Sequence, residues 1–329
     1  MSKRALVTGG GGFLGLYIVE ALLADGWQVR VFCRGQYQAL LDLDVEVING
    51  DLVDSGQITA ACADIDVVFH VASKTGPWGN YQDFYATNVL GTENVIAGCL
   101  AQGVKKLIYT SSPSVLSFYD DLCGVDEAYP FPEKRISAYQ ETKMLAEQRV
   151  IEANSSALCT TALRPHAIWG PRDTQLFATL MDRIKQNKLK IIGDGKNKIS
   201  VSYVENTAKA HLQAAQSDRV GGQVYFINEE QPVELWPWIN ELVASVGLKP
   251  VTKKVPYGLA YVIGSVCEWV CRVLPFLGDP PITRALVSVS GKHHYFDVSK
   301  AKRDFGFHNA VSMEDAKQRF ATYFKGIEQ

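Results

Sequence analysis

The stretch Ala5-Leu6-Val7-Thr8-Gly9-Gly10-Gly11-Gly12-Phe13-Leu14-Gly15 decides the fold class of this chain. A short apolar run ends in glycines spaced three apart, and a segment with helical periodicity follows at once. Glycine here permits a tight turn, close approach of the backbone to a pyrophosphate, and close packing of the helix on the strand. The start of the helix then offers free N–H groups to the phosphates. We therefore predict a dinucleotide-binding turn with contacts at Gly9, Gly12, Phe13, Leu14 and Gly15.

Short β-rich runs alternate with helix-length segments on both sides of this turn. The runs are apolar and rich in valine and isoleucine, as buried parallel strands are. They are Ala5–Thr8, Val29–Cys33, Val45–Asn49, Val67–Val71, Lys106–Thr110 and Thr160–Leu163. The segments with helical spacing are Leu14–Ala24, Phe84–Ala101 and Ala138–Ala153. This alternation predicts an α/β fold of the Rossmann type, with a doubly wound parallel sheet.

The pattern loosens after about Arg164, where proline and tryptophan become more frequent. We predict a cofactor-binding Rossmann domain over residues 1–165, with elements near 201–228 returning to its sheet. Residues 166–329 then form mainly a smaller, C-terminal substrate-binding region. A chain of 329 residues is long enough for this division.

Composition excludes several classes of protein. A net charge of −2 gives no general attraction to nucleic acid. The seven cysteines contain no C-x-x-C pair, and the six histidines show no metal-ligand spacing, so we predict neither a disulfide framework nor a metal site. A reducing compartment suits these cysteines, and no secretion signal precedes the first strand, so we expect a cytoplasmic protein.

The stretch 257–277 is strongly apolar and raises the question of membrane contact. Glu268 and Arg272 interrupt it four residues apart, where a helix would bring them together as an ion pair. The uninterrupted apolar length is therefore too short for a spanning helix. We expect peripheral membrane contact at most, with a core or lid helix as the alternative.

The end of the second predicted strand bears on the choice of cofactor. A site for NAD usually places an acid there, whereas a nearby arginine accommodates the 2′-phosphate of NADP. This chain has Cys33 followed by Arg34, so NADP is favoured, with NAD as the alternative if Arg34 is only a surface residue.

Other strand ends add candidate cofactor contacts. Asp51 and Leu52 follow the third strand, where an adenine would lie, unless Asp51 only begins the next turn. Ala72 and Lys74 follow the fourth strand, and a solvated role for Lys74 stays open. Asn88 lies inside a predicted helix although asparagine is a poor helix former, which indicates a polar task.

A tyrosine and a lysine four residues apart, Tyr139 and Lys143, are the candidate reacting pair. A lysine ammonium one helical turn away would lower the tyrosine pKa by favouring the phenolate, so that Tyr139 could exchange a proton with a carbonyl or alcohol oxygen. Ser112 follows the Lys106–Thr110 strand at the edge where α/β sheets bind ligands, and its hydroxyl could hold that oxygen. Ser111 is the rival for this role.

Together these motifs resemble those of the extended short-chain dehydrogenase/reductase family, over nearly the whole chain. The motifs are Thr8-Gly9-x-x-Gly12-x-x-Gly15, Asp51-Leu52, Asn88-Val89-x-Gly91-Thr92, Tyr109-Thr110-Ser111-Ser112, Tyr139-x-x-x-Lys143, Leu163-Arg164-Pro165, Gly193-Asp194-Gly195 and Tyr203-Val204-Glu205-Asn206-x-Ala208. The resemblance implies that Ser112 is the catalytic serine, that Lys143 holds the nicotinamide ribose, and that Pro165 lies against the nicotinamide. It also implies a homodimer formed through the helices at Phe84–Ala101 and Ala138–Ala153.

Within this family the chain resembles the 3β-hydroxysteroid dehydrogenase branch, and within that branch the bacterial 2-alkyl-3-oxoalkanoate reductases. Gly76-Pro77-Trp78-Gly79, Ile168-Trp169-Gly170-Pro171 and Pro280-Pro281-Ile282-Thr283-Arg284 are among the stretches that carry this resemblance. It implies an apolar ketone or secondary alcohol as substrate. A nucleotide-sugar epimerase or dehydratase is the alternative, since Arg172, Lys196 and Lys198 are available for a diphosphate. A non-catalytic NADP-sensing protein is the alternative from another class.

Overall fold

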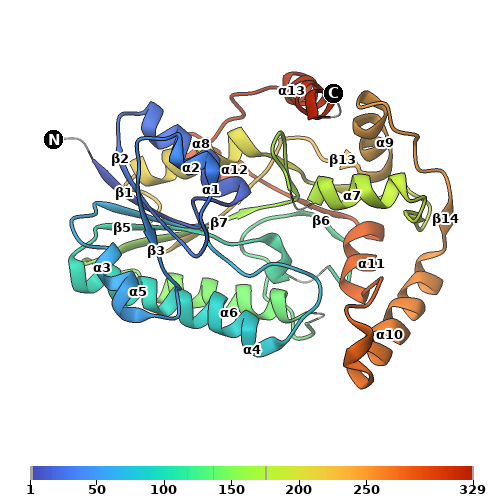
Figure 1. Cartoon of the computed structure of the whole chain (residues 1–329), viewed down its shortest axis with the longest axis horizontal. Coiled ribbons are helices and arrows are strands. Elements are labelled where there is room, and N and C mark those ends of the chain that lie inside the picture. The colour runs from blue at the N-terminus through green and yellow to red at the C-terminus, as the bar shows by residue number, and fades with distance from the viewer. Residues whose placement is uncertain (1–2, 117, 136, 175, 328–329) are drawn as a thin grey trace.

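Seven parallel strands form the central sheet, in the order β12-β7-β5-β4-β1-β2-β3 (Figure 1). The computed structural model describes residues 3–116, 118–135, 137–174 and 176–327. The strands are β1 Arg4–Thr8, β2 Gln28–Cys33, β3 Glu46–Asn49, β4 Val67–His70, β5 Lys106–Thr110, β7 Cys159–Pro165 and β12 Gln223–Ile227. The chain runs outward from β1 to β3 and then returns to β4 on the other side of β1. The carboxyl ends of β1 and β4 are thus the switch point at which such sheets bind ligands.

Helices cover both faces of this sheet (Figure 1). One face carries α1 Phe13–Ala24, α2 Gln38–Leu41, α8 Val204–Gln216 and α12 Ser299–Phe305. The other carries α3 Ser55–Ala61, α4 Tyr81–Tyr85, α5 Gly91–Gln102 and α6 Ala138–Glu152. The strands between these layers are almost fully buried at β1, β4 and β5, which explains their continuous apolar sequence. The predicted doubly wound fold is therefore confirmed.

One predicted helix is divided. The segment expected as a single helix over Phe84–Ala101 consists of α4, a π-helical turn at Ala86–Leu90 (η1) and α5. π-helical turns are rare and frequently lie at functional sites, because the extra residue redirects a side chain. Here the turn contains Asn88, whose side chain binds the loop after β4. The periodicity of the apolar residues continues through the turn, so the sequence pattern did not show it.

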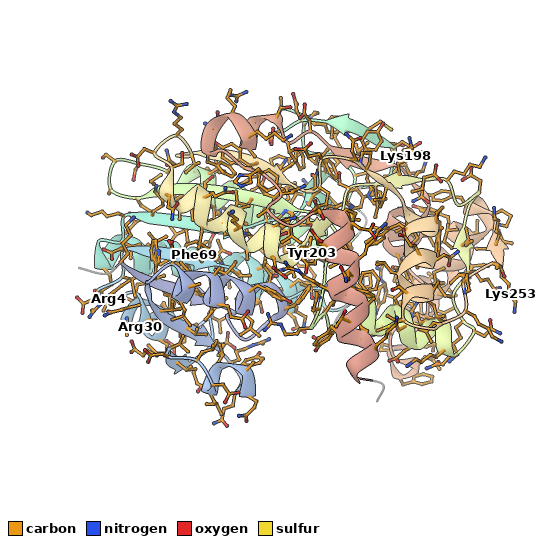
Figure 2. All side chains as sticks on the ribbon, turned by 90° about the horizontal axis from the view of Figure 1, so that it is seen from above. Arg4, Arg30, Phe69, Lys198, Tyr203 and Lys253 are labelled. Atoms are coloured by element: carbon orange, nitrogen blue, oxygen red, sulfur yellow. The ribbon has the colours of Figure 1, made fainter. Side chains whose placement is uncertain are left out.

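The C-terminal half adds a second lobe beside the sheet. It contains helices α7 Leu176–Lys185, α9 Leu235–Ser245, α10 Tyr257–Val273, α11 Arg284–Gly291 and α13 Met313–Ile327. A 3-10 turn at Pro275–Leu277 (η3) follows α10, and another at Pro113–Leu116 (η2) follows β5 of the central sheet. A small sheet has the order β13 Val233–Glu234, β10 Lys198–Ile199, β15 His294–Phe296 and β6 Leu122–Val125. Two strand pairs complete it, β11 Ser202–Tyr203 with β8 Ile168–Trp169 and β14 Lys254–Val255 with β9 Ile191–Ile192. Figure 2 shows Arg4 and Arg30 at one end of the molecule and Lys253 at the other.

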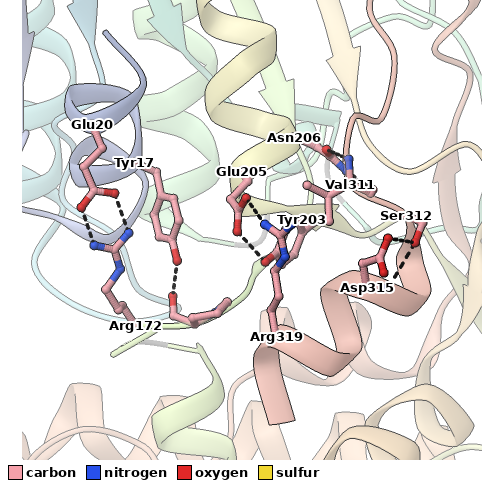
Figure 3. Close-up of polar contacts among 11 residues, drawn as sticks. Tyr17, Glu20, Arg172, Tyr203, Glu205, Asn206, Val311, Ser312, Asp315 and Arg319 are labelled. Carbon is pink, nitrogen blue, oxygen red and sulfur yellow. Dashed lines mark hydrogen bonds and ion pairs between the residues drawn. The ribbon is translucent and has the colours of Figure 1, made fainter. Parts of the chain in front are cut away.

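Polar contacts fasten the segment after β8 to the first helix (Figure 3). Arg172 binds Glu20 of α1 through two hydrogen bonds of 2.7 Å, and Tyr17 donates a hydrogen bond to the Pro171 carbonyl oxygen at 3.1 Å. Bidentate pairs of this kind hold geometry as well as charge. The chain that follows β7 is thereby fixed against the helix that begins at the glycine turn.

The apolar stretch 257–277 forms α10 and the following 3-10 turn. The expected pair of Glu268 with Arg272 is wrong: the Glu268 carboxylate accepts hydrogen bonds from the backbone N–H and Nε of Arg284, while Arg272 lies over the ring of Trp78. Because α10 packs on α11, the buried Glu268 meets the first residue of α11 and is neutralised there. Among the described residues, no helix has both the length and the apolar character needed to cross a membrane.

Candidate active site

The glycine turn between β1 and α1 borders a pocket of about 480 Å³ at the switch point of the sheet. Gly9 has a positive φ of 71°, and a side chain there would lie 2.8 Å from the Ala72 Cα. A Cβ at Gly15 would lie 2.2 Å from the Gly9 carbonyl oxygen. Both positions are thus closed to any side chain, which is the close backbone packing that a bound pyrophosphate requires. The turn fits a dinucleotide phosphate group.

Most of the predicted site residues line this one pocket. They are Gly9, Gly12, Phe13, Leu14, Gly15, Arg34, Asp51, Leu52, Ala72, Ser112, Tyr139, Lys143 and Pro165. Lys74 and Asn88 do not. The Lys74 ammonium pairs with Asp83 at 3.1 Å and lies over the Phe84 ring, so it is engaged with α4.

Asn88 does not line the pocket but stabilises the segments that form its wall. Its side chain is 2% exposed. Its Oδ1 accepts from the Lys74 backbone N–H at 2.7 Å, and its Nδ2 donates to the Lys74 carbonyl oxygen at 3.0 Å and to Thr142 Oγ1 at 3.1 Å. Asn88 thus ties the loop after β4 to α6, the helix that carries Tyr139 and Lys143. The polar task inferred from its sequence position is one of positioning.

A buried histidine network that the sequence did not reveal continues this wall. His70 ends β4, and its Nδ1 lies 2.7 Å from Thr8 Oγ1 while its Nε2 lies 2.9 Å from Thr92 Oγ1. Thr92 donates in turn to the Asn88 carbonyl oxygen. Burial, with a contribution from the charge of Lys143, lowers the pKa of His70 to about 3, so the ring is neutral. The network connects the end of β1 to the π-helical turn without adding charge beside the phosphates.

The guanidinium of Arg34 is available to bind a phosphate group. It is exposed at the end of β2 on the rim of the cofactor pocket. Among the residues that the structure describes, none forms a hydrogen bond or an ion pair with its guanidinium. Cys33 and Tyr37 are its neighbours on that rim. No carboxylate stands at this strand end, as the sequence indicated.

Tyr139 and Lys143 lie on one face of α6; Lys143 is buried and Tyr139 is partly buried. Burial raises the pKa of Tyr139 above its ordinary value, and the nearby hydroxyls of Ser112 and Ser114 act in the opposite direction. Burial also lowers the pKa of Lys143 to about 7, although the nearby Glu147 carboxylate acts to raise it.

The expected lowering of the Tyr139 pKa by Lys143 is therefore wrong for the free protein. Lys143 Nζ donates to the Thr110 carbonyl oxygen at 2.6 Å and lies 4.2 Å from the centroid of the Tyr109 ring. Because burial favours the uncharged form of Lys143, the lysine has less effect on the pKa of the Tyr139 phenol. The desolvation of both groups outweighs the attraction that their spacing predicts.

Glu147 continues this face of α6 and forms a buried ion pair with Arg164 of β7. Arg164 Nε donates to the Glu147 carboxylate at 2.8 Å, and both side chains are almost fully buried. The guanidinium also lies over the rings of Phe131 and Phe226. A pair of this kind fixes the register of α6 on the sheet, because neither partner can be buried without the other.

A second cavity, of about 650 Å³, lies between Tyr139 and the helices of the second lobe. Its walls are mainly apolar and come from α7, α9, α10 and α11, and they include Phe177, Leu180, Trp236, Ile239, Ile263 and Leu286. Ser112 and Tyr139 border this cavity and the cofactor pocket, whereas Ser111 borders the cofactor pocket alone. The geometry thus separates the two serines that the sequence left as rivals. The expected apolar substrate and C-terminal substrate-binding region agree with this cavity, but spacing did not define its walls, which are far apart in the chain.

Two histidines that the sequence gave no role stand together in the cavity wall. His294 Nε2 donates to the Val289 carbonyl oxygen at 2.7 Å, so its Nδ1 accepts from His166 Nε2 at 2.6 Å. Burial lowers the pKa of both rings, and that of His294 to about 4. Phe118 stacks on His294. The pair is neutral, and the described residues contain no cluster of histidine, cysteine and carboxylate side chains able to hold a metal ion.

Known proteins are similar to this chain in sequence and in fold. The sequence model of the 3-beta hydroxysteroid dehydrogenase/isomerase family matches residues 6–256. A 2-alkyl-3-oxoalkanoate reductase of Stenotrophomonas maltophilia is 41% identical over 323 residues, which cover 96% of this chain and 98% of the relative. A decarboxylating sterol-4-alpha-carboxylate 3-dehydrogenase of Mus musculus is 34% identical over 337 residues, covering 100% of this chain and 92% of the relative.

A solved UDP-glucose 4-epimerase from Thermotoga maritima has the same fold, with a TM-score of 0.78, 21% identity, and coverage of 99% of this chain and all of that one. At that identity the likeness concerns the fold alone. The match of the family model over most of the chain and the two relatives above 30% identity carry more weight. They show that the chain belongs to the 3-beta hydroxysteroid dehydrogenase/isomerase family and is a dehydrogenase or reductase with the short-chain dehydrogenase/reductase fold.

Proposed function

We infer that this chain is an NADP-preferring reductase of the ketone of a lipid-like substrate, of the 2-alkyl-3-oxoalkanoate type. The observation that carries the inference is the position of Ser112 and Tyr139, which border the cofactor pocket and the apolar cavity together. A substrate carbonyl held between these two side chains would face the nicotinamide in the cofactor pocket. The alkyl chains of the substrate would then lie in the apolar cavity. The relative from Stenotrophomonas maltophilia, a 2-alkyl-3-oxoalkanoate reductase, supports the substrate class.

The protonation state of Tyr139 suits the reductive direction. Because burial raises its pKa, the phenol keeps its proton at neutral pH and can give it to a carbonyl oxygen that gains negative charge. Ser112 would orient that oxygen by a hydrogen bond. Lys143, whose pKa of about 7 makes it a proton donor at neutral pH, would supply charge or a proton to the phenolate that remains.

The cofactor, when bound, supplies the hydride. Gly9, Gly12 and Gly15 would hold its pyrophosphate, and Asp51 and Leu52 its adenine, with Pro165 against the nicotinamide. Arg34 supports NADP over NAD because no described residue pairs with its guanidinium and it lies at the end of β2, where a 2′-phosphate would be bound. We further propose a cofactor-binding domain over 1–165, to which elements near 201–228 return, and a mainly substrate-binding region over 166–329. We also propose a cytoplasmic location and a homodimer formed through α4–α6.

The nucleotide-sugar alternative is the weaker one. Arg172, which the sequence offered for a diphosphate, is committed to Glu20 of α1. The cavity beyond Tyr139 is lined mainly by apolar side chains, which suit alkyl chains better than a charged diphosphate.

Turnover tests this proposal. Purified protein should oxidise NADPH with a 2-alkyl-3-oxoalkanoate and act weakly or not at all on a UDP-sugar. Tyr139→Phe should reduce kcat by about 100-fold or more, since it removes the proton donor, whereas Tyr323→Phe in α13 should leave kcat unchanged. Turnover of the sugar alone would favour the epimerase alternative. Activities unaffected by Tyr139→Phe would contradict the catalytic role of Tyr139, and NADPH binding without turnover of any substrate would favour the sensing protein.

A further inference from the structure

The helix α10 presents an apolar face to solvent rather than to the protein. Large side chains that are 40% exposed or more recur along it and through the 3-10 turn that follows. They are Leu259, Val262, Ile263, Val266, Trp269, Val273, Leu274, Phe276 and Leu277, and together they are the α10 face. Trp269 is 66% exposed and Phe276 is 82% exposed. A continuous apolar surface of this extent is unusual on a monomeric protein and marks a site of interaction.

The spacing of these residues places them on one side of α10. Positions 259, 262, 263, 266, 269 and 273 recur every three or four residues and share one side. The opposite side contains Ala260, Gly264 and Glu268, which are buried. Glu268 is neutralised there by Arg284 of α11. Arg272 is exposed beside Trp269 and lies over the Trp78 ring. Glu268, the only acid of α10, is buried, so no carboxylate of this helix would oppose contact with an anionic surface.

The α10 face is continuous with the cavity that borders Tyr139. Ile263 is 43% exposed on the face and also lines that cavity, together with Ala260 of the same helix. Figure 1 shows α10 and α11 projecting at one end of the molecule, away from the central sheet. The outer surface of one helix thus lies at the wall of the apolar cavity.

The charges around the face indicate what covers it. Residues 249–292 contain six lysines and arginines and two acids, a balance of +4 in a chain whose net charge is −2. The basic residues are Lys249, Lys253, Lys254, Arg272, Arg284 and Lys292. Lys253 points outward at that end of the molecule (Figure 2). An apolar face within a segment of net positive charge is complementary to an anionic lipid surface, into which the apolar side chains would insert while cations of the segment meet headgroups.

We propose that the α10 face binds the surface of an anionic lipid bilayer. A second copy of this chain is a poorer occupant, because a twofold interface would bring the same positive segment of each copy together. The proposal stands independently of the reaction, since it concerns binding and not turnover.

Trp269 provides a direct test. Of the six tryptophans, all within the described residues, it alone is exposed. Vesicles of phosphatidylcholine and phosphatidylglycerol with brominated acyl chains should quench its fluorescence, and Trp269→Phe should remove most of that quenching while the protein still floats with the vesicles. Vesicles of phosphatidylcholine alone should bind more weakly, and raised salt should weaken binding to the anionic vesicles.

Substitutions in the face test its role in binding. Val266→Glu with Phe276→Ser should lower the vesicle partition coefficient by about tenfold or more. Leu41→Ser, at a side chain that is 68% exposed on α2, is the matched control and should leave the coefficient unchanged. Thermal melting followed by circular dichroism shows whether each variant is folded. The proposal fails if anionic vesicles do not bind the protein, if the double variant binds as the unaltered protein does, or if its main effect is to dissociate a dimer measured by light scattering.

Discussion

Replacing Lys143 by methionine is expected to stabilise the folded protein at pH 7 while removing activity. Lys143 is 2% exposed, and burial lowers its pKa from 10.5 to about 7. The unfolded chain therefore binds more protons than the folded one between these two values, so the stability contributed by this residue rises with pH across that window. Methionine has a similar length and carries no charge to desolvate.

The magnitude follows from the shift. A pKa that is lower by 3.5 units, 10.5 against about 7, corresponds to about 4 kcal/mol of lost stability at pH 7, where the folded lysine is half protonated. The substitution also removes the hydrogen bond to the Thr110 carbonyl oxygen, which costs about 1–3 kcal/mol if that oxygen stays unpaired. The variant should thus be more stable by about 1–3 kcal/mol at pH 7. Near pH 10 the advantage should vanish or reverse, because little desolvation cost remains there.

Urea denaturation of both proteins at pH 7 and at pH 10 measures this difference. Lys74→Met is the matched control, because the Lys74 ammonium is partly exposed and paired with Asp83, so its replacement should change stability by less than about 1 kcal/mol at either pH. If Lys143→Met is less stable than the unaltered protein at pH 7, or if the difference does not depend on pH, the buried ammonium does not carry the cost described.

Three other substitutions test the cofactor pocket. Gly15→Ala should abolish NADPH binding in a fluorescence titration, because its Cβ would lie 2.2 Å from the Gly9 carbonyl oxygen. The control is Gly103→Ala, which has open space around its Cβ and should keep NADPH binding while losing some stability. Arg34→Glu should raise the Kd for NADPH by about tenfold or more and that for NADH little, and equal effects on both cofactors would contradict the assignment of Arg34. Asn88→Ala should lower the free energy of unfolding by about 2–3 kcal/mol, since it removes hydrogen bonds to Lys74 and Thr142; a loss below about 0.5 kcal/mol would contradict the positioning role.

The central sheet could be predicted from the sequence because its signals are local. Parallel strands buried on both faces appear as short apolar runs, and the six predicted runs correspond to β1, β2, β3, β4, β5 and β7 within two residues at each end. The π-helical turn at Ala86–Leu90 was missed because one extra residue leaves the apolar periodicity nearly unchanged. The partner of Glu268 was missed for a different reason, since the i, i+4 rule describes an isolated helix and α10 packs on α11.

The candidate site divides in the same way. Residues at strand ends and in the glycine turn were found because the fold brings the carboxyl ends of parallel strands to one edge. An apolar substrate was predicted, but the shape of the cavity was not, because its walls come from four helices of the second lobe and only tertiary packing brings them together. His166 and His294 are separated by 128 positions and meet through one hydrogen bond, for which the sequence contains no spacing signal. The pKa of Tyr139 was misjudged because burial, the dominant cause, is not visible in the spacing.

Each half of the site leaves one buried donor unpaired among the described residues. Ser111 Oγ borders the cofactor pocket, and Trp238 Nε1 belongs to a residue that lines the apolar cavity. A buried donor without a partner costs about 1–3 kcal/mol, and the desolvated ammonium of Lys143 adds to that cost. These two donors belong to residues that line the spaces where ligands would bind, so an acceptor on a ligand could pair with them. A ligand that supplies an acceptor to Ser111 or Trp238 should therefore stabilise the folded protein by more than the area that it buries would account for.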